Sequence, residues 1–355
     1  MNFPTLSIGH LKPKFPIIQG GMGIGISMHR LAGAVAAAGG IGVISGANPG
    51  FKEPDFLTNP FSANLVALAK EIRLAKAFAP EGFFGVNILC ATSQYADLVK
   101  TAVAEKIDLI ISGAGLPKNL PELVAGSDTK IAPIVSSRKT VDTLLKLWDK
   151  RYQRTADAIV VEGPLAGGHL GFSKEDLLNN PPNLIDLVKE VIEAVKPFEE
   201  KYGIEIPVIA AGGIYTPEDA AIYYELGAKG VQMATRFIGT VECDAADSYK
   251  QAFINANEGD VQLVVSPVGL PGRAIRSALT QKLELGRVPV TRCIGCLGHC
   301  DPATTPYCIT GALVEAVNGN IEDGLIFSGA NGYRIEEITT VGAIFDEFKL
   351  YFNVV

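Results

Sequence analysis

The sequence predicts a (β/α)8 barrel, which is an α/β fold, with a cysteine-containing extension at its C-terminal end. Short apolar runs alternate with amphipathic stretches from the N-terminus to about residue 255, giving eight of each. The short runs are almost continuously apolar, as strands of a parallel sheet are when helices cover both faces. Barrels of this kind take about 250 residues as one domain. A doubly wound sheet is the alternative, because alternation alone does not prove that the sheet closes.

The expected strands are the short apolar runs. Each is bounded by glycine, proline or polar residues, which end a strand. The ranges are 15–19, 42–45, 83–89, 108–112, 130–135, 158–161, 207–211 and 230–233.

The expected helices lie between these strands, where apolar residues recur at helical spacing. The first ends at Gly39 and Gly40, the second ends before Pro80, and the seventh begins with Pro217 after the capping residue Thr216. An insertion at 172–182 precedes the sixth. The ranges are 28–38, 64–78, 94–105, 120–124, 141–150, 184–202, 217–226 and 245–256.

Residues 1–260 are thus expected to form the barrel, and residues 261–355 an extension that packs at or beside its mouth. The chain has 355 residues, is 48% hydrophobic and carries a formal net charge of −7, which argues against a nucleic-acid partner. The most apolar stretch, 31–47, is broken by glycines and indicates a buried helix and strand rather than a membrane span. With no evident signal peptide, we expect a cytoplasmic protein that acts on a small molecule, without a membrane partner. Whether the protein forms a homo-oligomer stays open.

Four of the six cysteines cluster in the extension with the spacing C-x2-C-x3-C-x7-C. Four thiols so close together could bind zinc or an iron–sulfur cluster. The alternative is a set of reduced thiols in a small packed loop, since a zinc ribbon usually splits its ligands into two separated pairs. We therefore assign no metal and leave the metal alternative open for Cys293, Cys296, Cys300 and Cys308.

Chemistry in a barrel gathers at the C-terminal ends of the strands. There, residues 162–171 (EGPLAGGHLG) directly follow the strand 158–161 and place His169, one of only four histidines, in a glycine-rich turn. An imidazole with a pKa near 6.5 can act as acid or base at neutral pH, so we predict a catalytic role for His169. The alternative is a buried histidine bonded to a neighbouring carbonyl group.

The ends of the last two strands indicate a phosphate site. Gly212 and Gly213 follow the seventh strand, and Thr235 follows the eighth at the start of a helix. Backbone N–H groups and a helix N-terminus hold phosphate at this position in many barrels. The alternative is that the glycines only permit tight turns.

Other candidates have two interpretations each. Ser136, Ser137 and Arg138 could touch a cofactor or cap the next helix. Glu162 is expected to anchor the His169 loop, and the alternative is contact with a cation. Arg273 and Arg276 could meet a substrate anion or be ordinary surface residues, and the segment 331–334 could reach the mouth.

Five segments resemble the nitronate monooxygenase family, formerly called 2-nitropropane dioxygenases, which also includes FMN-dependent enoyl-acyl-carrier-protein reductases. They occur in the family's order over residues 13–280. They are PIIQGGM (16–22), GVN (85–87), EGPLAGGH (162–169), AGGI (211–214) and VQMATRF (231–237).

The resemblance implies a barrel that binds FMN. Gly21, Met22 and Asn87 would line the isoalloxazine ring, and Gly167 and Gly168 would let the histidine loop approach it. The residues implied at the ribityl phosphate end are Gly212, Gly213, Gln232 and Thr235, and the implied catalytic residue is His169. Ala234 stands where family members often have glycine, which adds a methyl group near the phosphate.

The resemblance also implies the reaction, which we take to be oxidation of alkyl nitronates with O2. The alternatives on the same scaffold are an NAD(P)H-dependent enoyl-thioester reductase and an NAD(P)H:quinone reductase. Flavin can serve all three reactions. A phosphate-ligand-binding barrel without redox activity is a fourth alternative, and the cysteine cluster lies outside the resemblance.

Overall fold

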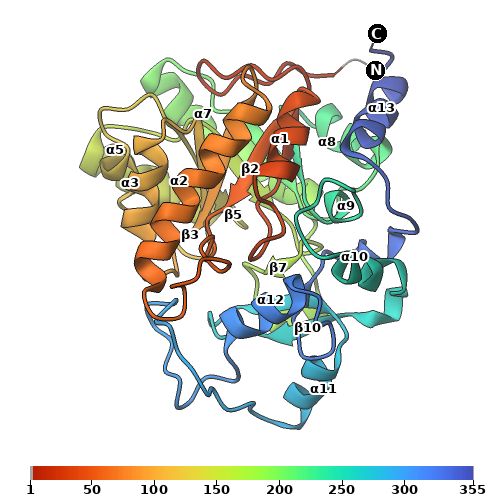
Figure 1. The fold of residues 1–355 in the computed structure, drawn as a ribbon. Coiled ribbons are helices and arrows are strands. Elements are labelled where there is room, and N and C mark those ends of the chain that lie inside the picture. The colour runs from red at the N-terminus through yellow and green to blue at the C-terminus, as the bar shows by residue number, and fades with distance from the viewer. Residues whose placement is uncertain (1–2, 355) are drawn as a thin grey trace.

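The structure is a computed structural model that describes residues 3–354, and its centre is a closed barrel of eight parallel strands (Figure 1). β1 pairs with β2 on one side and β9 on the other, so the sheet closes. This confirms the predicted barrel, and the doubly wound alternative is wrong. The barrel strands are β1 (Ile17–Gln19), β2 (Ile41–Ser45), β3 (Phe83–Leu89), β4 (Leu109–Gly113), β5 (Lys130–Val135), β6 (Ile159–Glu162), β8 (Val208–Ala211) and β9 (Gly230–Met233).

The helices surround the barrel near the predicted positions. α5 begins at Arg138 rather than 141, because the Ser137 side chain accepts a hydrogen bond from Thr140 N and caps it. α2 begins at Pro60 rather than 64, since proline fits the first turn of a helix. The helices of this part are α1 (His29–Ala37), α2 (Pro60–Phe78), α3 (Tyr95–Ala104), α4 (Leu120–Leu123), α5 (Arg138–Tyr152), α6 (Lys174–Asn179), α7 (Leu184–Tyr202), α8 (Pro217–Glu225), α9 (Thr235–Ile238) and α10 (Asp247–Ile254).

Apolar side chains fill the inside of the barrel. Ile18, Val43 and Val160 belong to this inner cluster, together with Leu6 and Leu11 from the N-terminal segment. In Figure 1 this segment crosses the end of the barrel opposite the extension. The N-terminal segment therefore covers that end of the barrel.

The extension forms a second, antiparallel sheet beneath the mouth of the barrel (Figure 1). β11 (Pro271–Ile275) pairs with β10 (Val261–Val265), with β12 (Ile326–Phe327) and with β7 (Gly168–His169). β7 belongs to the segment that we predicted to be a turn, so this part of the prediction is wrong. It becomes a strand because β11, more than a hundred residues later, supplies its hydrogen-bonding partner.

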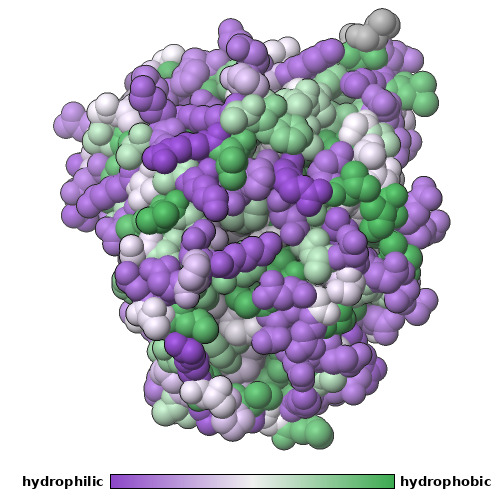
Figure 2. Space-filling view, viewed as in Figure 1, coloured by the Kyte–Doolittle hydropathy of each residue, from purple (hydrophilic) through white to green (hydrophobic). Residues whose placement is uncertain are grey.

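Three helices complete the extension. α11 (Ala278–Leu285) and α12 (Ile309–Val317) lie beneath the barrel, whereas α13 (Val341–Tyr351) returns to its far end beside α1 (Figure 1). Within residues 3–354, no helix combines the length and the apolar character that crossing a bilayer requires. The face shown in Figure 2 is mostly hydrophilic, with apolar residues in small separate groups.

Candidate functional site

A cavity lies at the C-terminal ends of the barrel strands, between the barrel and the extension. Residues from the ends of β1, β3, β6, β8 and β9 line it, and Phe327, Ser328, Gly329 and Asn331 of the extension form another part of its wall. All nine residues predicted to bind the cofactor line this cavity. They are Gly21, Met22, Asn87, Gly167, Gly168, Gly212, Gly213, Gln232 and Thr235.

Two side-chain amides in the cavity wall have an unused acceptor. The Oδ1 atom of Asn87 on β3 and the Oε1 atom of Gln232 on β9 are buried and have no hydrogen-bond partner. A buried polar atom without a partner is costly, and most such atoms in proteins are paired. Both amides therefore fit a ligand that offers hydrogen-bond donors between β3 and β9.

The glycines after β8 adopt a backbone conformation that favours glycine. Gly212 and Gly213 have φ angles of +96° and +90°, and a Cβ atom on Gly213 would lie 2.9 Å from the Cβ atom of Leu165. The tight-turn interpretation is therefore sufficient to explain why glycine stands here. Both residues nevertheless border the cavity, where no side chain of theirs blocks a ligand.

Two titratable groups lie on β6 and on the segment after it. Glu162 lines the cavity, and burial raises the pKa of its carboxyl group to about 8. Burial also lowers the pKa of His169 to about 4. Burial thus favours the protonated form of Glu162 and the neutral imidazole of His169.

His169 borders the cavity indirectly. It is absent from the cavity lining, although its neighbour Gly168 belongs to it. The Nε2 atom of His169 lies 2.7 Å from the Oγ atom of Ser266, and its ring packs edge-on against Phe327, with ring centroids 5.2 Å apart. Phe327 does line the cavity, so the imidazole stands behind this phenyl ring.

The extension is hydrogen-bonded to the predicted phosphate end. Gly329 N donates to the Oγ1 atom of Thr235 at 2.9 Å, and the Nδ2 atom of Asn331 donates to Gly213 O at 2.6 Å. Arg273 on β11 donates to the carbonyl oxygens of Pro164 and Ala166, at 2.7 and 2.6 Å. The loops after β6, β8 and β9 therefore take their positions partly from the extension.

Comparison with known proteins decides the family. The sequence model described as nitronate monooxygenase matches residues 5–349. The chain belongs to the nitronate monooxygenase family.

Individual relatives within and around the nitronate monooxygenase family have several names. A probable nitronate monooxygenase of Staphylococcus saprophyticus is 27% identical over 313 residues, covering 80% of this chain and 82% of the relative. The structure of FabK from Thermotoga maritima is 27% identical with a TM-score of 0.71, covering 96% of this chain and 94% of that one.

A further relative is the (3aS,4S,5R,7aS)-5-hydroxy-7a-methyl-1-oxo-octahydro-1H-indene-4-carboxyl-CoA dehydrogenase of Mycobacterium tuberculosis. It is 30% identical over 273 residues, which cover 76% of this chain. The match spans 66% of that dehydrogenase, just under two thirds of its length. The chain is thus similar to proteins with different named activities.

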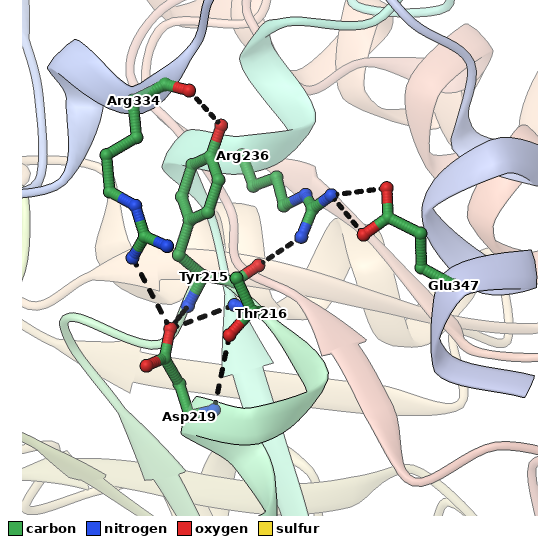
Figure 3. A network of polar contacts seen from close by, with 6 residues as sticks. All are labelled: Tyr215, Thr216, Asp219, Arg236, Arg334 and Glu347. Carbon is green, nitrogen blue, oxygen red and sulfur yellow. Dashed lines mark hydrogen bonds and ion pairs between the residues drawn. The ribbon is translucent and has the colours of Figure 1, made fainter. Parts of the chain in front are cut away.

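A polar network that the sequence did not reveal fixes one corner of this nitronate monooxygenase-family site (Figure 3). The ring of Tyr215 lies between the guanidinium groups of Arg236 and Arg334, 4.8 and 4.5 Å from its centroid. Arg236 also binds Glu347 on α13, and Tyr215 itself lines the cavity. The sequence signal for Tyr215 was its aromatic type, two positions after the glycine pair. No local sequence pattern indicated Glu347.

The remaining sequence candidates have structural contacts. Ser137 is the N-cap of α5, and the Ser136 hydroxyl group donates to Gly171 O in the histidine loop. Arg276 is exposed, unlike Arg273. Among the described residues, 3–354, no three His, Cys, Asp or Glu side chains are arranged to hold one metal ion.

Proposed function

We propose that this enzyme binds FMN in the mouth cavity and oxidises alkyl nitronates with O2. The observation that carries the proposal is the composition of the cavity wall, which is rich in glycine and apolar side chains and includes no lysine or arginine among the described residues. Glycine-rich turns offer backbone N–H groups for the phosphate of FMN, so that group needs no lysine or arginine here. A small alkyl nitronate suits such a cavity, because its short apolar chain needs no extended binding surface.

The cavity residues fit FMN. The unpaired oxygens of Asn87 and Gln232 would accept hydrogen bonds from the polar edge of the flavin ring, because both are buried acceptors facing the cavity. Gly21 and Met22 would line the ring, and Gly167 and Gly168 leave it room. The proposed phosphate end comprises Gly212, Gly213 and Thr235. The Thr235 hydroxyl group accepts from Gly329 N and keeps its own proton free to donate.

Bound FMN would supply the electron acceptor for the nitronate and pass the electrons on to O2. Burial favours the protonated form of Glu162, whose carboxyl group can donate a hydrogen bond into the cavity. Burial lowers the pKa of His169 and makes its imidazole a weaker base than a free one. The role that we propose for His169, orienting the substrate or exchanging a proton with it, rests on the family resemblance, since its imidazole bonds Ser266 and lies outside the cavity lining.

A second candidate is reduction of an enoyl thioester or a quinone by NAD(P)H. Its support is an apolar groove on the extension, lined by Leu263, Val265 and Leu270, which also contains Ser266, the partner of His169. A lysine, Lys174, lies on the rim of this groove. A long acyl chain could use such a surface, whereas a small nitronate would not.

Anaerobic mixing of the flavin-loaded enzyme with propionate 3-nitronate, and separately with NADH and NADPH, distinguishes the two candidates. Under the proposal, nitronate alone bleaches the oxidised flavin absorbance, and air restores it. Bleaching by NADH or NADPH without any response to nitronate would favour the thioester or quinone reductase. A preparation that binds no flavin would contradict both.

A further inference from the structure

The extension contains a loop whose four cysteines surround one small cavity. We call residues 293–308 the cysteine loop. Its cavity is separate from the mouth cavity, and its other walls are mostly apolar side chains, among them Ile294, Leu297 and Ile309. The thiols that line it are those of Cys293, Cys296, Cys300 and Cys308. None of the four forms a disulfide.

Hydrogen bonds converge on the sulfur atoms of the cysteine loop. Gly295 N donates to the Sγ atom of Cys293, and Gly311 N donates to that of Cys308, both at 3.4 Å. Burial raises the pKa of the Cys296 thiol, and a side-chain hydrogen bond with Thr310 of α12 opposes this effect. Hydrogen bonds to sulfur stabilise thiolates, and around iron–sulfur clusters they tune the reduction potential.

α12 adds to this stabilisation. Cys308 is its N-cap residue, so the thiol lies at the positive end of a nine-residue helix. Asn48 from the loop after β2 holds Thr310 through its Nδ2 atom, at 3.0 Å from the Oγ1 atom. The cysteine loop and α12, which are adjacent in the sequence, are thus held in part by a distant segment, the loop after β2.

The cysteine loop is also fixed to the barrel. Ser93 N donates to Cys296 O and Gly298 N donates to Ala91 O, both at 3.1 Å, and Thr92 forms a β-bridge with Leu297. These barrel residues directly follow β3, the strand that carries Asn87 of the mouth cavity. The loop therefore has a defined place beside the mouth rather than a free surface position.

We propose that the four thiols of the cysteine loop bind an iron–sulfur cluster. Four cysteinate ligands are the usual set for [2Fe–2S] and [4Fe–4S] clusters. A single zinc ion would draw its four sulfurs to about 2.3 Å from one centre. No three such ligands are so arranged within residues 3–354, yet all four cysteines line the same cavity. The ligands of a cluster bind different irons, so they need not converge on one centre.

The test uses the full-length protein, produced and purified without oxygen, with iron, zinc and acid-labile sulfide measured per chain. The expected result is iron and sulfide in equal amounts, about two or about four of each. The reduced protein should also give an EPR signal that FMN alone does not give. One zinc per chain without sulfide would overturn the proposal. So would the absence of iron after incubation with ferrous iron, sulfide and a thiol reductant.

A matched pair of variants assigns the ligands. Cys296→Ser should lose most of the iron and sulfide, whereas Cys90→Ser, which changes another half-buried cysteine in the loop after β3, should keep both. Flavin content and circular dichroism show whether each variant is folded. Iron at the wild-type level in folded Cys296→Ser would overturn the assignment.

If Cys296→Ser does not fold, alkylation of the wild-type protein replaces it. The four thiols should resist iodoacetamide before treatment with an iron chelator and react after it. Equal reactivity in both states would contradict the proposal. None of these measurements depends on which substrate the flavin site uses.

Discussion

Gly329 of the extension donates its backbone N–H to the Oγ1 atom of Thr235 at 2.9 Å, which joins two residues 94 positions apart. Thr235 lies at the end of β9, where the phosphate of FMN is proposed to bind. The bond shows that the extension is part of the cavity wall. A bound flavin should therefore affect the positions of both the loop from β12 to Asn331 and the barrel loops.

Thr235→Val should weaken flavin binding by tenfold or more. The hydroxyl group is removed at constant volume, and a hydrogen bond to a charged group contributes roughly 1.5–3 kcal/mol. Thr235→Ser keeps the hydroxyl group and should retain most of the affinity. The measurement is a flavin titration of the flavin-free protein. Equal affinity of the Val variant and the wild type would remove Thr235 from the phosphate site.

Gln232→Leu should weaken flavin binding about tenfold without lowering the stability of the flavin-free protein. Its Oε1 atom has no partner in that state, so its removal leaves no group newly unpaired. Gln19→Leu is the matched control, because the Oε1 atom of Gln19 accepts from Val43 N at 3.0 Å.

The control variant Gln19→Leu should therefore destabilise the flavin-free protein, as measured by denaturant unfolding. A Gln232→Leu variant that is destabilised as much as Gln19→Leu would indicate a structural rather than a flavin-binding role.

His169→Ala should leave flavin bound and slow turnover by ~10²-fold or more, as removal of a general base does. The control is His10→Ala, which changes an exposed histidine that is distant from His169 in the sequence. It should have wild-type turnover. Steady-state rates with a nitronate and flavin content per chain are the two readouts. Turnover of the His169 variant within a few-fold of the wild type would refute the assigned role.

The stability of the flavin-free protein should fall as the pH rises from 6.5 to 8, partly because of Glu162. Burial raises the pKa of its carboxyl group from 4.5 to about 8. Between these values the folded state binds more protons than the unfolded state, so the free energy of unfolding decreases with pH. His169 has the opposite effect below pH 6.5, because burial lowers its pKa to about 4.

Glu162→Gln cannot ionise, so it should flatten the decrease in Tm between pH 6.5 and 8. Glu190→Gln changes an exposed carboxyl group on α7 and should leave the decrease as in the wild type. An unchanged pH profile in the Glu162 variant would show that this carboxyl group does not carry the dependence.

Arg273→Met should lower the free energy of unfolding by roughly 2 kcal/mol, because two carbonyl groups of the histidine loop lose their donor. Turnover should fall as well, since this loop carries His169. Arg276→Met changes an exposed residue three positions away and should alter neither the free energy of unfolding nor turnover. The comparison of the two variants by chemical denaturation and by turnover tests whether Arg273 positions the loop.

The fold could be predicted because the signal is local. A buried parallel strand is a short apolar run, and a surrounding helix shows its own period, so each barrel strand was found within a few residues. Helix starts were less accurate where a cap decided them, as Ser137 did for α5. The nine cofactor candidates came from strand ends and a family resemblance, and the closed barrel brings all nine to one cavity.

The tertiary structure alone determined how the extension contributes to the site at the mouth of the barrel. The pairing of β7 with β11, the bond of His169 to Ser266, and the place of Tyr215 between two arginines all join distant segments. Such contacts leave no period or motif in the sequence, because they depend on how the extension packs against the barrel. The sequence by itself determined a barrel with a glycine-rich mouth. The packing of the extension determined which side chains reach that mouth, and it set the burial that keeps His169 neutral.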